Sequence, residues 1–236
     1  MSSAGPEDQD PAAAELEARL SAFLADFLGA WPPVGELLIA TSPARHTPGW
    51  DGQVRPLAGV ATPEGMVVSV PPEHLEQASS LAAAGRAAFG AGVGELFGRP
   101  SARLRSGIFR AARRLVDLGE PGEWLASEYP RLPGWLAAFP GEVLVSFDDE
   151  GRYAAGVGLK RHSALGREIA VGTEPAHRGQ GLARGLVAQA ARRIFAEGAT
   201  ATYLHAPDNF ASGAVATAAG FPDLGWRSIG LTGGEG

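Results

Sequence analysis

The residues of this chain that are best suited to chemistry form a charged, glycine-rich turn near position 180. Arg178, Gly179 and Gly181 stand in this turn, and the helical spacing of apolar residues begins directly after it, at Leu182. The first N–H groups of a helix have no partner within the helix, and the helix dipole places roughly half a positive charge there. Glycines let a diphosphate approach the backbone without a Cβ in the way. This order of residue types predicts an anion-binding helix start.

A strand and a helix must hold this turn in place. Apolar and small residues alternate over 167–173, which indicates a strand, and Pro175 then ends the ladder because proline has no N–H. From Leu182 to Ile194 apolar residues recur at every fourth position, as on one face of a helix, and Gly198 offers a stop. A strand, a glycine turn and a helix in succession are typical of phosphate-binding sites.

Two familiar nucleotide-binding motifs do not fit the turn. The dinucleotide fingerprint requires a third glycine three positions after Gly181, where this chain has Arg184. The P-loop requires Gly-Lys-Ser/Thr, which is absent here. A nucleotide-binding oxidoreductase is therefore a weak hypothesis.

The turn instead reads Arg-x-x-Gly-x-Ala across Arg178, Gly181 and Ala183, with Pro175 three residues upstream. This pattern resembles the acetyl-CoA pyrophosphate loop of the GNAT superfamily of N-acetyltransferases.

A second block supports this resemblance. The stretch from Asn209 through Ser212 to Val215, closed by Gly220 and Phe221, is similar to the family's Asn-x-x-Ala/Ser-x-x-Leu/Val helix. Two blocks in the right order are far more specific than one. The resemblance covers about residues 141–231.

The resemblance implies an α/β (α+β) fold, with a GNAT-like mixed sheet flanked by helices. Strands 167–173 and 199–206 would be parallel neighbours that separate and hold the pantetheine arm of the cosubstrate, acetyl-CoA, between them. The backbone of 179–183 would hold the diphosphate. The residues that the resemblance assigns to cofactor binding are Val171, Gly172, Thr173, Arg178, Gly179, Gln180, Gly181, Leu182, Ala183, Asn209 and Ser212. An N-cap role is equally plausible for Asn209.

Transfer of an acetyl group to an amine requires a neutral amine, whose conjugate acid has a pKa of ~10.4, and a proton donor for the leaving thiolate. The resemblance implies Glu168 as the general base, although an exposed glutamate at a strand edge is as plausible a reading. The family's usual tyrosine acid is replaced by Ala216, which leaves Tyr203 or His205 as substitutes. His162 is interpreted as a surface residue.

The leading hypothesis is an acetyl-CoA-dependent N-acetyltransferase. It would transfer the acetyl group, by direct attack in a ternary complex, to a primary amine of a small-molecule or amino-acid-like acceptor. The alternative is a non-catalytic acyl-CoA-binding module, which the alanine at position 216 suggests.

Composition limits the partners. The formal net charge of −6 disfavours nucleic acid, and the chain has no cysteine for a thiolate metal site. No metal-binding residues are predicted. No apolar run approaches the ~18–20 residues of a membrane span, so we predict no membrane partner and a cytoplasmic protein. A homodimer is left open.

Upstream of the resemblance, we predict a disordered tail over residues 1–11, an N-terminal α/β region over 12–118 and the GNAT-like domain over 119–236. The elements expected in this N-terminal region are helices at 12–28, 73–89 and 101–118 and strands at 36–41, 54–61 and 66–70. The arginines of 101–118 are interpreted as a solvated helix face. The turn at His46, Trp50 and Asp51 is interpreted as packed structure in preference to a substrate pocket.

The predicted domain lacks one expected part. Residues 123–139 are predicted to be helical or broken-helical, so the first strand of a GNAT fold is not evident. We therefore expect the N-terminal region either to complete the sheet or to form a degenerate sister domain.

Overall fold

The computed structural model describes residues 11–232. Its helices are α1 (Pro11–Leu28), α2 (Leu75–Ala83), α3 (Arg86–Leu96), α4 (Leu182–Ala196) and α5 (Phe210–Ala218), with short 3-10 turns at Pro43–Arg45, Pro72–His74, Leu136–Ala138 and Pro175–His177. Its strands are β1 (Leu37–Thr41), β2 (Ala58–Ala61), β3 (Met66–Val70), β4 (Arg103–Ala111), β5 (Glu123–Ala126), β6 (Glu142–Phe147), β7 (Tyr153–Arg161), β8 (Gly166–Thr173), β9 (Thr200–His205) and β10 (Arg227–Thr232).

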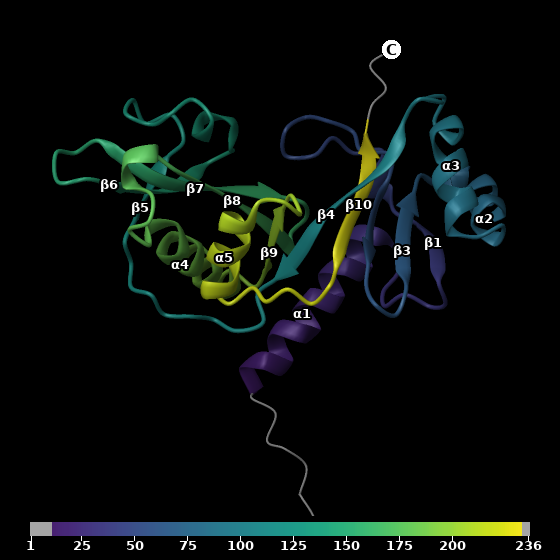
Figure 1. Ribbon diagram of the computed structural model, residues 1–236, viewed down its shortest axis with the longest axis horizontal. Helices are drawn as coiled ribbons and strands as arrows, with labels where there is room; N and C mark the ends of the chain where they lie inside the picture. Colours follow the sequence, from purple (N-terminus) through teal and green to yellow (C-terminus); the bar gives the residue numbers. More distant parts are fainter. Residues whose placement is uncertain (1–10, 233–236) are drawn as a thin grey trace, which may run out of the picture.

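All these strands belong to one mixed sheet, in the order β1-β3-β2-β10-β4-β9-β8-β7-β6-β5 (Figure 1). Helices α2 and α3 pack on one face of its N-terminal end, and α4 packs on the same face of its C-terminal end. Helix α1 and the 3-10 turn at Leu136–Ala138 pack on the opposite face. The predicted fold class, a mixed sheet flanked by helices, is confirmed.

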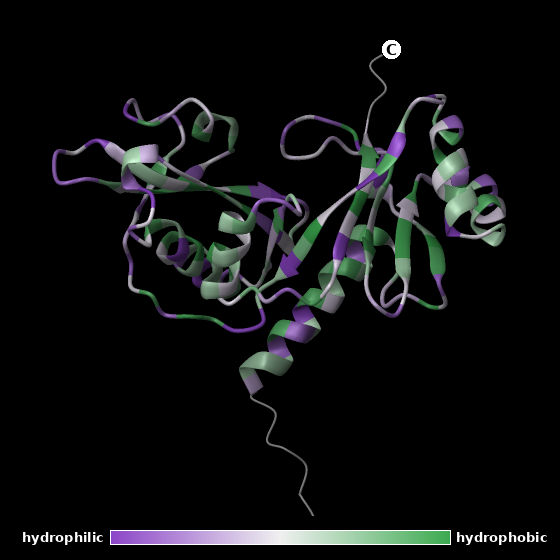
Figure 2. Cartoon of the chain, viewed as in Figure 1, coloured by the Kyte–Doolittle hydropathy of each residue, from purple (hydrophilic) through white to green (hydrophobic). Residues whose placement is uncertain are grey.

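The N-terminal region completes the sheet. Strand β4 lies between β9 and β10 and is antiparallel to both, while β10 pairs on its other side with β2. Strands β1 and β3 are hydrophobic along most of their length (Figure 2), because α1 covers one face of them and α2 and α3 cover the other.

The helix predicted at 101–118 was wrong, because residues 103–111 form strand β4. The arginines there were read as a helix face, but the backbone is extended, and the alternation of a strand sends Leu104 and Ile108 to one face and Phe109 to the other. Phe109 is 6% exposed against α1, and Arg110 is 7% exposed, so this end of the strand is buried, whereas Arg103 and Arg105 at its start are exposed. A central place in the sheet overrides the weak local helix signal.

The helical reading of 123–139 was also wrong in part. Glu123–Ala126 forms β5, which pairs antiparallel with β6 at the edge of the sheet and supplies the strand that was not evident. The helix predicted at 73–89 is divided into α2 and α3 by a break at Ala84 and Gly85. Strand β2 begins at Ala58, four residues later than expected. Of the predicted tail, residues 1–10 lie outside the described part of the chain, and Pro11 begins α1.

The elements expected around the glycine turn are present. Strands β6, β7 and β8 form an antiparallel meander, and β8 and β9 are parallel, joined by α4. Within residues 11–232, no helix is both long and apolar enough to cross a membrane.

Candidate active site

The glycine turn leads into α4 with two glycines in a left-handed conformation. Gly179 has φ 79° and Gly181, the N-cap of α4, has φ 84°. Side chains rarely adopt this conformation, so glycine is favoured at both positions. Nε of Arg178 donates to the Thr173 carbonyl at 3.4 Å, which ties the turn to the end of β8. The arrangement gives α4 an open, cationic N-terminus.

Strands β8 and β9 separate next to this turn. Their parallel pairing runs from Gly166 and Thr200 to Ile169 and Tyr203 and ends there. Beyond that point β8 stays paired with β7 as far as Thr173, and β9 stays paired with β4 as far as His205. The facing edges of β8 and β9 are therefore free to bond to an extended chain placed between them.

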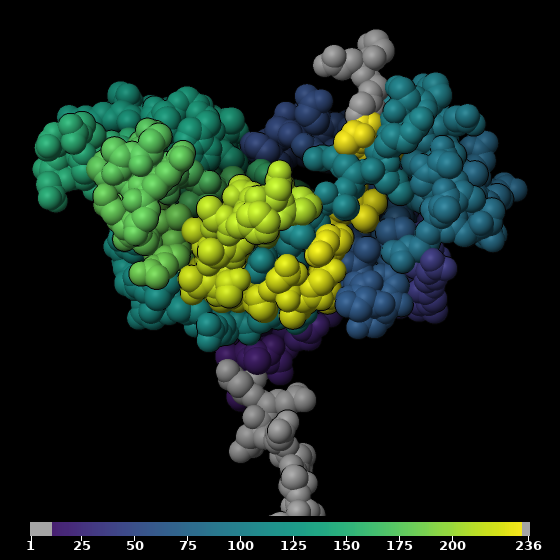
Figure 3. All heavy atoms as spheres, viewed as in Figure 1, coloured from purple at the N-terminus to yellow at the C-terminus, as the bar shows by residue number. Residues whose placement is uncertain are grey.

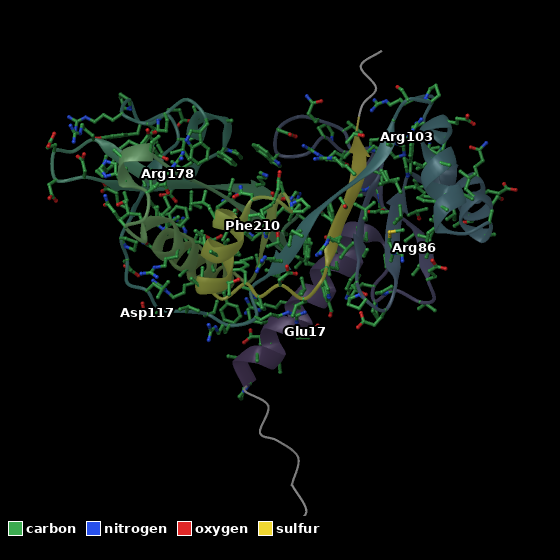
Figure 4. All side chains as sticks on the ribbon, viewed as in Figure 1. Glu17, Arg86, Arg103, Asp117, Arg178 and Phe210 are labelled. Carbon is green, nitrogen blue, oxygen red and sulfur yellow. The ribbon has the colours of Figure 1, made fainter. Side chains whose placement is uncertain are left out.

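A cavity of about 650 Å³ lies over this separation, between α4 and α5; we call it the α4–α5 cavity. In Figure 3 the segment around the glycine turn and helix α5 form the two sides of this cavity. Figure 4 labels Arg178 on the first side and Phe210 at the start of the second. Every residue predicted to bind the cofactor lines this cavity: Val171, Gly172, Thr173, Arg178, Gly179, Gln180, Gly181, Leu182, Ala183, Asn209 and Ser212.

Helix α5 closes the cavity through two of these residues. Asn209 is the N-cap of α5, and its Oδ1 accepts from the Ser212 N–H at 3.0 Å, so the predicted capping role is present. The Ser212 hydroxyl lies 2.8 Å from the Tyr203 hydroxyl. Burial raises the pKa of Tyr203, against a smaller opposing effect of the Ser212 hydrogen bond. Tyr203 therefore keeps its proton at neutral pH and can donate a hydrogen bond into the cavity.

The opposite face of the sheet holds a second cavity, of about 440 Å³, which we call the α1 cavity. Its walls come from α1, the loop after β1, and strands β2, β4, β7, β8, β9 and β10. Glu168 faces this side, because it stands opposite Thr202 and so alternates with Ile169 and Tyr203. The structure therefore does not bring Glu168 and Tyr203 into one cavity. Glu168 lines the α1 cavity on one face of the sheet, and Tyr203 lines the α4–α5 cavity on the other face.

Lys160 and His162 hold the Glu168 carboxylate. Oε1 of Glu168 accepts from Lys160 Nζ at 2.5 Å, and Oε2 lies 3.0 Å from His162 Nε2. Burial by itself raises the pKa of Glu168, but the hydrogen bonds and charges of His162 and Lys160 together outweigh it, so the pKa lies below its ordinary value. Glu168 is ionised at neutral pH and lines the α1 cavity, but it is only 6% exposed, so Lys160 and His162 present more surface to the cavity than the carboxylate does.

The sequence reading missed several residues of the α1 cavity. His162 was taken for a surface residue, but it lines the cavity and packs against Phe27 with 5.3 Å between ring centres. Trp50 also lines it and stacks on Phe139 at 4.9 Å, so it is both packed structure and cavity wall. The alternation of β7 and β8 around their hairpin could have found Lys160, which stands directly opposite Glu168.

His205 has both ring nitrogens engaged. Nδ1 lies 2.9 Å from the Ala206 carbonyl, to which it donates, so Nε2 is the acceptor for the Arg110 Nε–H at 3.0 Å. Arg110 also donates to the Phe221 carbonyl and to Thr217. This network anchors the end of β9, and it leaves His205 poorly placed to supply a proton.

Comparisons with known proteins give one family match and several similar solved structures. The model of the acetyltransferase (GNAT) family matches residues 109–221. Among the solved structures that match is a GNAT-family protein of Novosphingobium aromaticivorans, with 20% identity and a TM-score of 0.46; the match covers 56% of this chain and 67% of that chain. Another is an acetyltransferase from the GNAT family of Colwellia psychrerythraea, with 14% identity and a TM-score of 0.43; the match covers 55% of this chain and 56% of that chain. A tandem GNAT protein of the clavulanic acid biosynthesis pathway also matches, with 13% identity and a TM-score of 0.43; the match covers 59% of this chain and 57% of that chain. The chain thus spans little more than half the length of the last two structures, and no curated protein matches it.

Proposed function

Since the chain belongs to the GNAT acetyltransferase superfamily through its domain at residues 109–221, we propose that it is an acetyl-CoA-dependent N-acetyltransferase acting on a primary amine of a small molecule. The observation that carries this proposal is the separation of β8 and β9 after Ile169 and Tyr203, beside the open N-terminus of α4. Such a gap accepts an extended arm, and the helix start accepts a diphosphate.

The residues proposed for the cosubstrate divide by position. The N–H groups of 179–183 would hold the diphosphate, with Arg178 supplying positive charge and bracing the turn. The edge of β8 from Val171 to Thr173 would bond to the pantetheine amides, and Asn209 and Ser212 would border the arm from α5. The acetyl group would then reach the gap between the two cavities.

We assign the α1 cavity to the acceptor amine. The amine nitrogen attacks the thioester carbonyl carbon in a ternary complex, the C–S bond breaks, and the amine gives up one proton. We propose that Glu168 draws this proton through His162, whose Nε2 it holds while Nδ1 has no hydrogen-bond partner among the described residues. A histidine is an effective general base when a carboxylate orients its ring and stabilises the imidazolium that forms.

The leaving thiolate needs a proton on the other side of the sheet. Ala216 is fully buried and offers none, so Tyr203 is the proposed donor. Its hydroxyl is held by Ser212 and lines the α4–α5 cavity.

A thermal-shift experiment tests the cosubstrate site. Acetyl-CoA should raise the melting temperature by mass action, and NAD should not. Gly181→Asp places a side chain and a negative charge in the α4–α5 cavity and should abolish the shift. The matched control is Gly198→Asp, at the other end of α4, where φ is also positive (81°) and where a Cβ meets nothing within 4 Å. A folded Gly181→Asp variant with wild-type acetyl-CoA affinity would contradict the proposal.

Turnover is measured as release of free CoA thiol in the presence of a panel of amines. The chain has no cysteine, so a thiol reagent has no protein background. Amine-dependent thiol release is the expected result. Tight acetyl-CoA binding with no release for any amine would instead identify a non-catalytic acyl-CoA-binding module.

A further inference from the structure

We infer that the acceptor is an elongated primary amine with an apolar body and a carboxylate remote from the amine. This inference rests on the proposed function and concerns the chemistry of the α1 cavity. The cavity has apolar walls, a cation without a partner at one end, and a length that separates this cation from the place of transfer.

The apolar walls come from both halves of the chain. Phe23 and Phe27 reach in from α1, Trp50 from the loop after β1, Phe109 from β4 and Leu204 from β9. A cavity of this kind gains from burying an apolar body, by about 25 cal/mol for each Å² removed from water. An acceptor that is polar along its whole length would forgo this gain.

The floor at the far end is formed by small residues. Gly107 of β4 stands opposite Ser228 of β10, and a Cβ on Gly107 would lie 3.1 Å from the Ser228 hydroxyl. Two residues further along, Gly230 stands opposite Arg105, and a Cβ on Gly230 would lie 3.5 Å from Arg105 Nε. The absence of a side chain at Gly230 lets the Arg105 side chain lie across β10 at the end of the cavity.

The charges of the cavity wall leave Arg105 unmatched. Arg55 is paired with Asp51, at 2.5 and 2.9 Å, and Lys160 is paired with Glu168. Arg105 is exposed and has no hydrogen bond or ion pair among the described residues. A further cation, Arg45, is 2% exposed and hydrogen-bonds to the carbonyls of Phe27 and Arg55 but to no carboxylate. The field in the cavity therefore favours an anionic group on the ligand.

The strand register gives the distance between the two ends. Leu204 is the first β9 residue beyond the last pair with β8, and it stands opposite Phe109. Arg105 lies four residues further along β4, which at about 3.3 Å per residue is roughly 13 Å. An α-amino acid, whose amine and carboxylate share one carbon, is too short to span this. An ω-amino acid or a short apolar peptide is long enough.

The test compares acceptors in matched pairs, with thiol release as the readout. One pair is 10-aminodecanoate and decylamine, and the other is an apolar tripeptide with a free or an amidated C-terminus. Phenylalanine serves as the short acceptor. We expect the carboxylate member of at least one pair to have a kcat/KM about tenfold higher or more, as for a charge-assisted hydrogen bond. The pair that responds distinguishes an ω-amino acid from a peptide.

Arg105→Gln should remove this preference by raising KM for the carboxylate acceptor about tenfold, with little effect on decylamine. The matched control is Arg103→Gln, on the same strand (Figure 4), because Arg103 donates to the Pro100 carbonyl and does not line the cavity. Equal use of both members of each pair, or phenylalanine as the best acceptor, would overturn the inference while leaving the proposed function standing. No thiol release with any amine would overturn the proposed function itself.

Discussion

Glu168 and its two neighbours act as one electrostatic unit. The carboxylate is 6% exposed, whereas the side chains of Lys160 and His162 are 27% and 22% exposed. A proton or an amine that enters the α1 cavity therefore meets Lys160 and His162 before it meets the carboxylate. Removal of the carboxylate would leave two partly buried donors without an acceptor, which is costly in a site of low polarity.

Glu168→Gln is predicted to lower both turnover and stability. Loss of a general base typically reduces the rate by 10²–10⁴-fold, and acetyl-CoA binding should be unchanged because Glu168 does not line the α4–α5 cavity. Unfolding free energy at pH 7 should fall by about 1–3 kcal/mol, because Lys160 and His162 lose the carboxylate that they hydrogen-bond to. Steady-state kinetics and urea unfolding measure the two effects.

The pH dependence of this stability difference has a definite sign. The pKa of Glu168 is lowered in the folded protein, so its contribution is complete above the unfolded carboxyl pKa of about 4.3 and disappears as pH falls through the lowered folded value. The gap between wild type and Glu168→Gln should thus be constant from pH 7 to about 5 and narrow below. Glu142→Gln, which breaks an exposed pair with Arg193, is the control and should change stability little. A gap that widens in acid would refute this account.

At the scale of elements, one aromatic ring of α1 makes a very close contact with the backbone of the sheet. Phe23 of α1 is 2% exposed and lies directly over Gly166, the first residue of β8, where a Cβ would overlap the ring. The absence of a side chain at Gly166 therefore sets how closely α1 approaches the sheet. The same helix supplies a wall of the α1 cavity, so its docking also shapes the proposed acceptor site.

Gly166→Ala is predicted to destabilise the protein by about 1–3 kcal/mol, as expected for overpacking of a close contact. The loss should be smaller when introduced together with Phe23→Leu, which removes the ring atoms involved, and the double-mutant cycle should give a coupling of about 0.5 kcal/mol or more. Gly134→Ala is the control, because a Cβ there meets nothing within 4 Å. Additive effects of Gly166→Ala and Phe23→Leu would show that the ring does not limit the approach.

Elements with a strong local pattern were predictable, and those defined by distant pairing were not. The glycine turn and α4 have local signals, namely two glycines at positive φ and a helical repeat of apolar residues. Strand β4 gains its identity from β9 and β10, which lie about 90 and 120 residues away in the chain. Its arginines gave no local sign of this, so the helix prediction was wrong.

The same distinction holds within the candidate site. The residues predicted to bind acetyl-CoA come from two local motifs, and they meet in one cavity. The α1 cavity draws instead on Trp50, Arg105 and His162, which belong to three separate segments. No spacing within the sequence joins these segments, because the sheet order brings them together.

At the scale of the whole molecule, the N-terminal and C-terminal halves share one sheet. Residues 12–118 were predicted as an N-terminal α/β region that would either complete the sheet or form a degenerate sister domain. Its last strand, β4, lies between β9 and β10 of the predicted domain 119–236. The domain boundary drawn from sequence thus separates two neighbours of a continuous ladder.

Residues 119–236 expressed alone are predicted to be insoluble or molten. Without β4, strands β9 and β10 lose the strand that joins them, and the unpaired edges and the face that α1 covers would be exposed to water. Near-UV circular dichroism and urea unfolding would detect the loss of fixed packing. Co-expression with residues 1–118 is the control and should restore a soluble complex. A cooperative fragment that binds acetyl-CoA would show that β4 is dispensable.

The position of β10 has a consequence for synthesis on the ribosome. Among the described strands, β10 is the one that joins β1, β3 and β2 to the rest of the sheet, through its pairing with β2 and β4. Because β10 follows all of these strands in the chain, the sheet remains in two parts, β1-β3-β2 and β4-β9-β8-β7-β6-β5, until β10 has been synthesised. The wall of the α1 cavity that carries Ser228 and Gly230 arrives in this same last step. The α1 cavity, the proposed acceptor site, is therefore complete only after β10 has been translated.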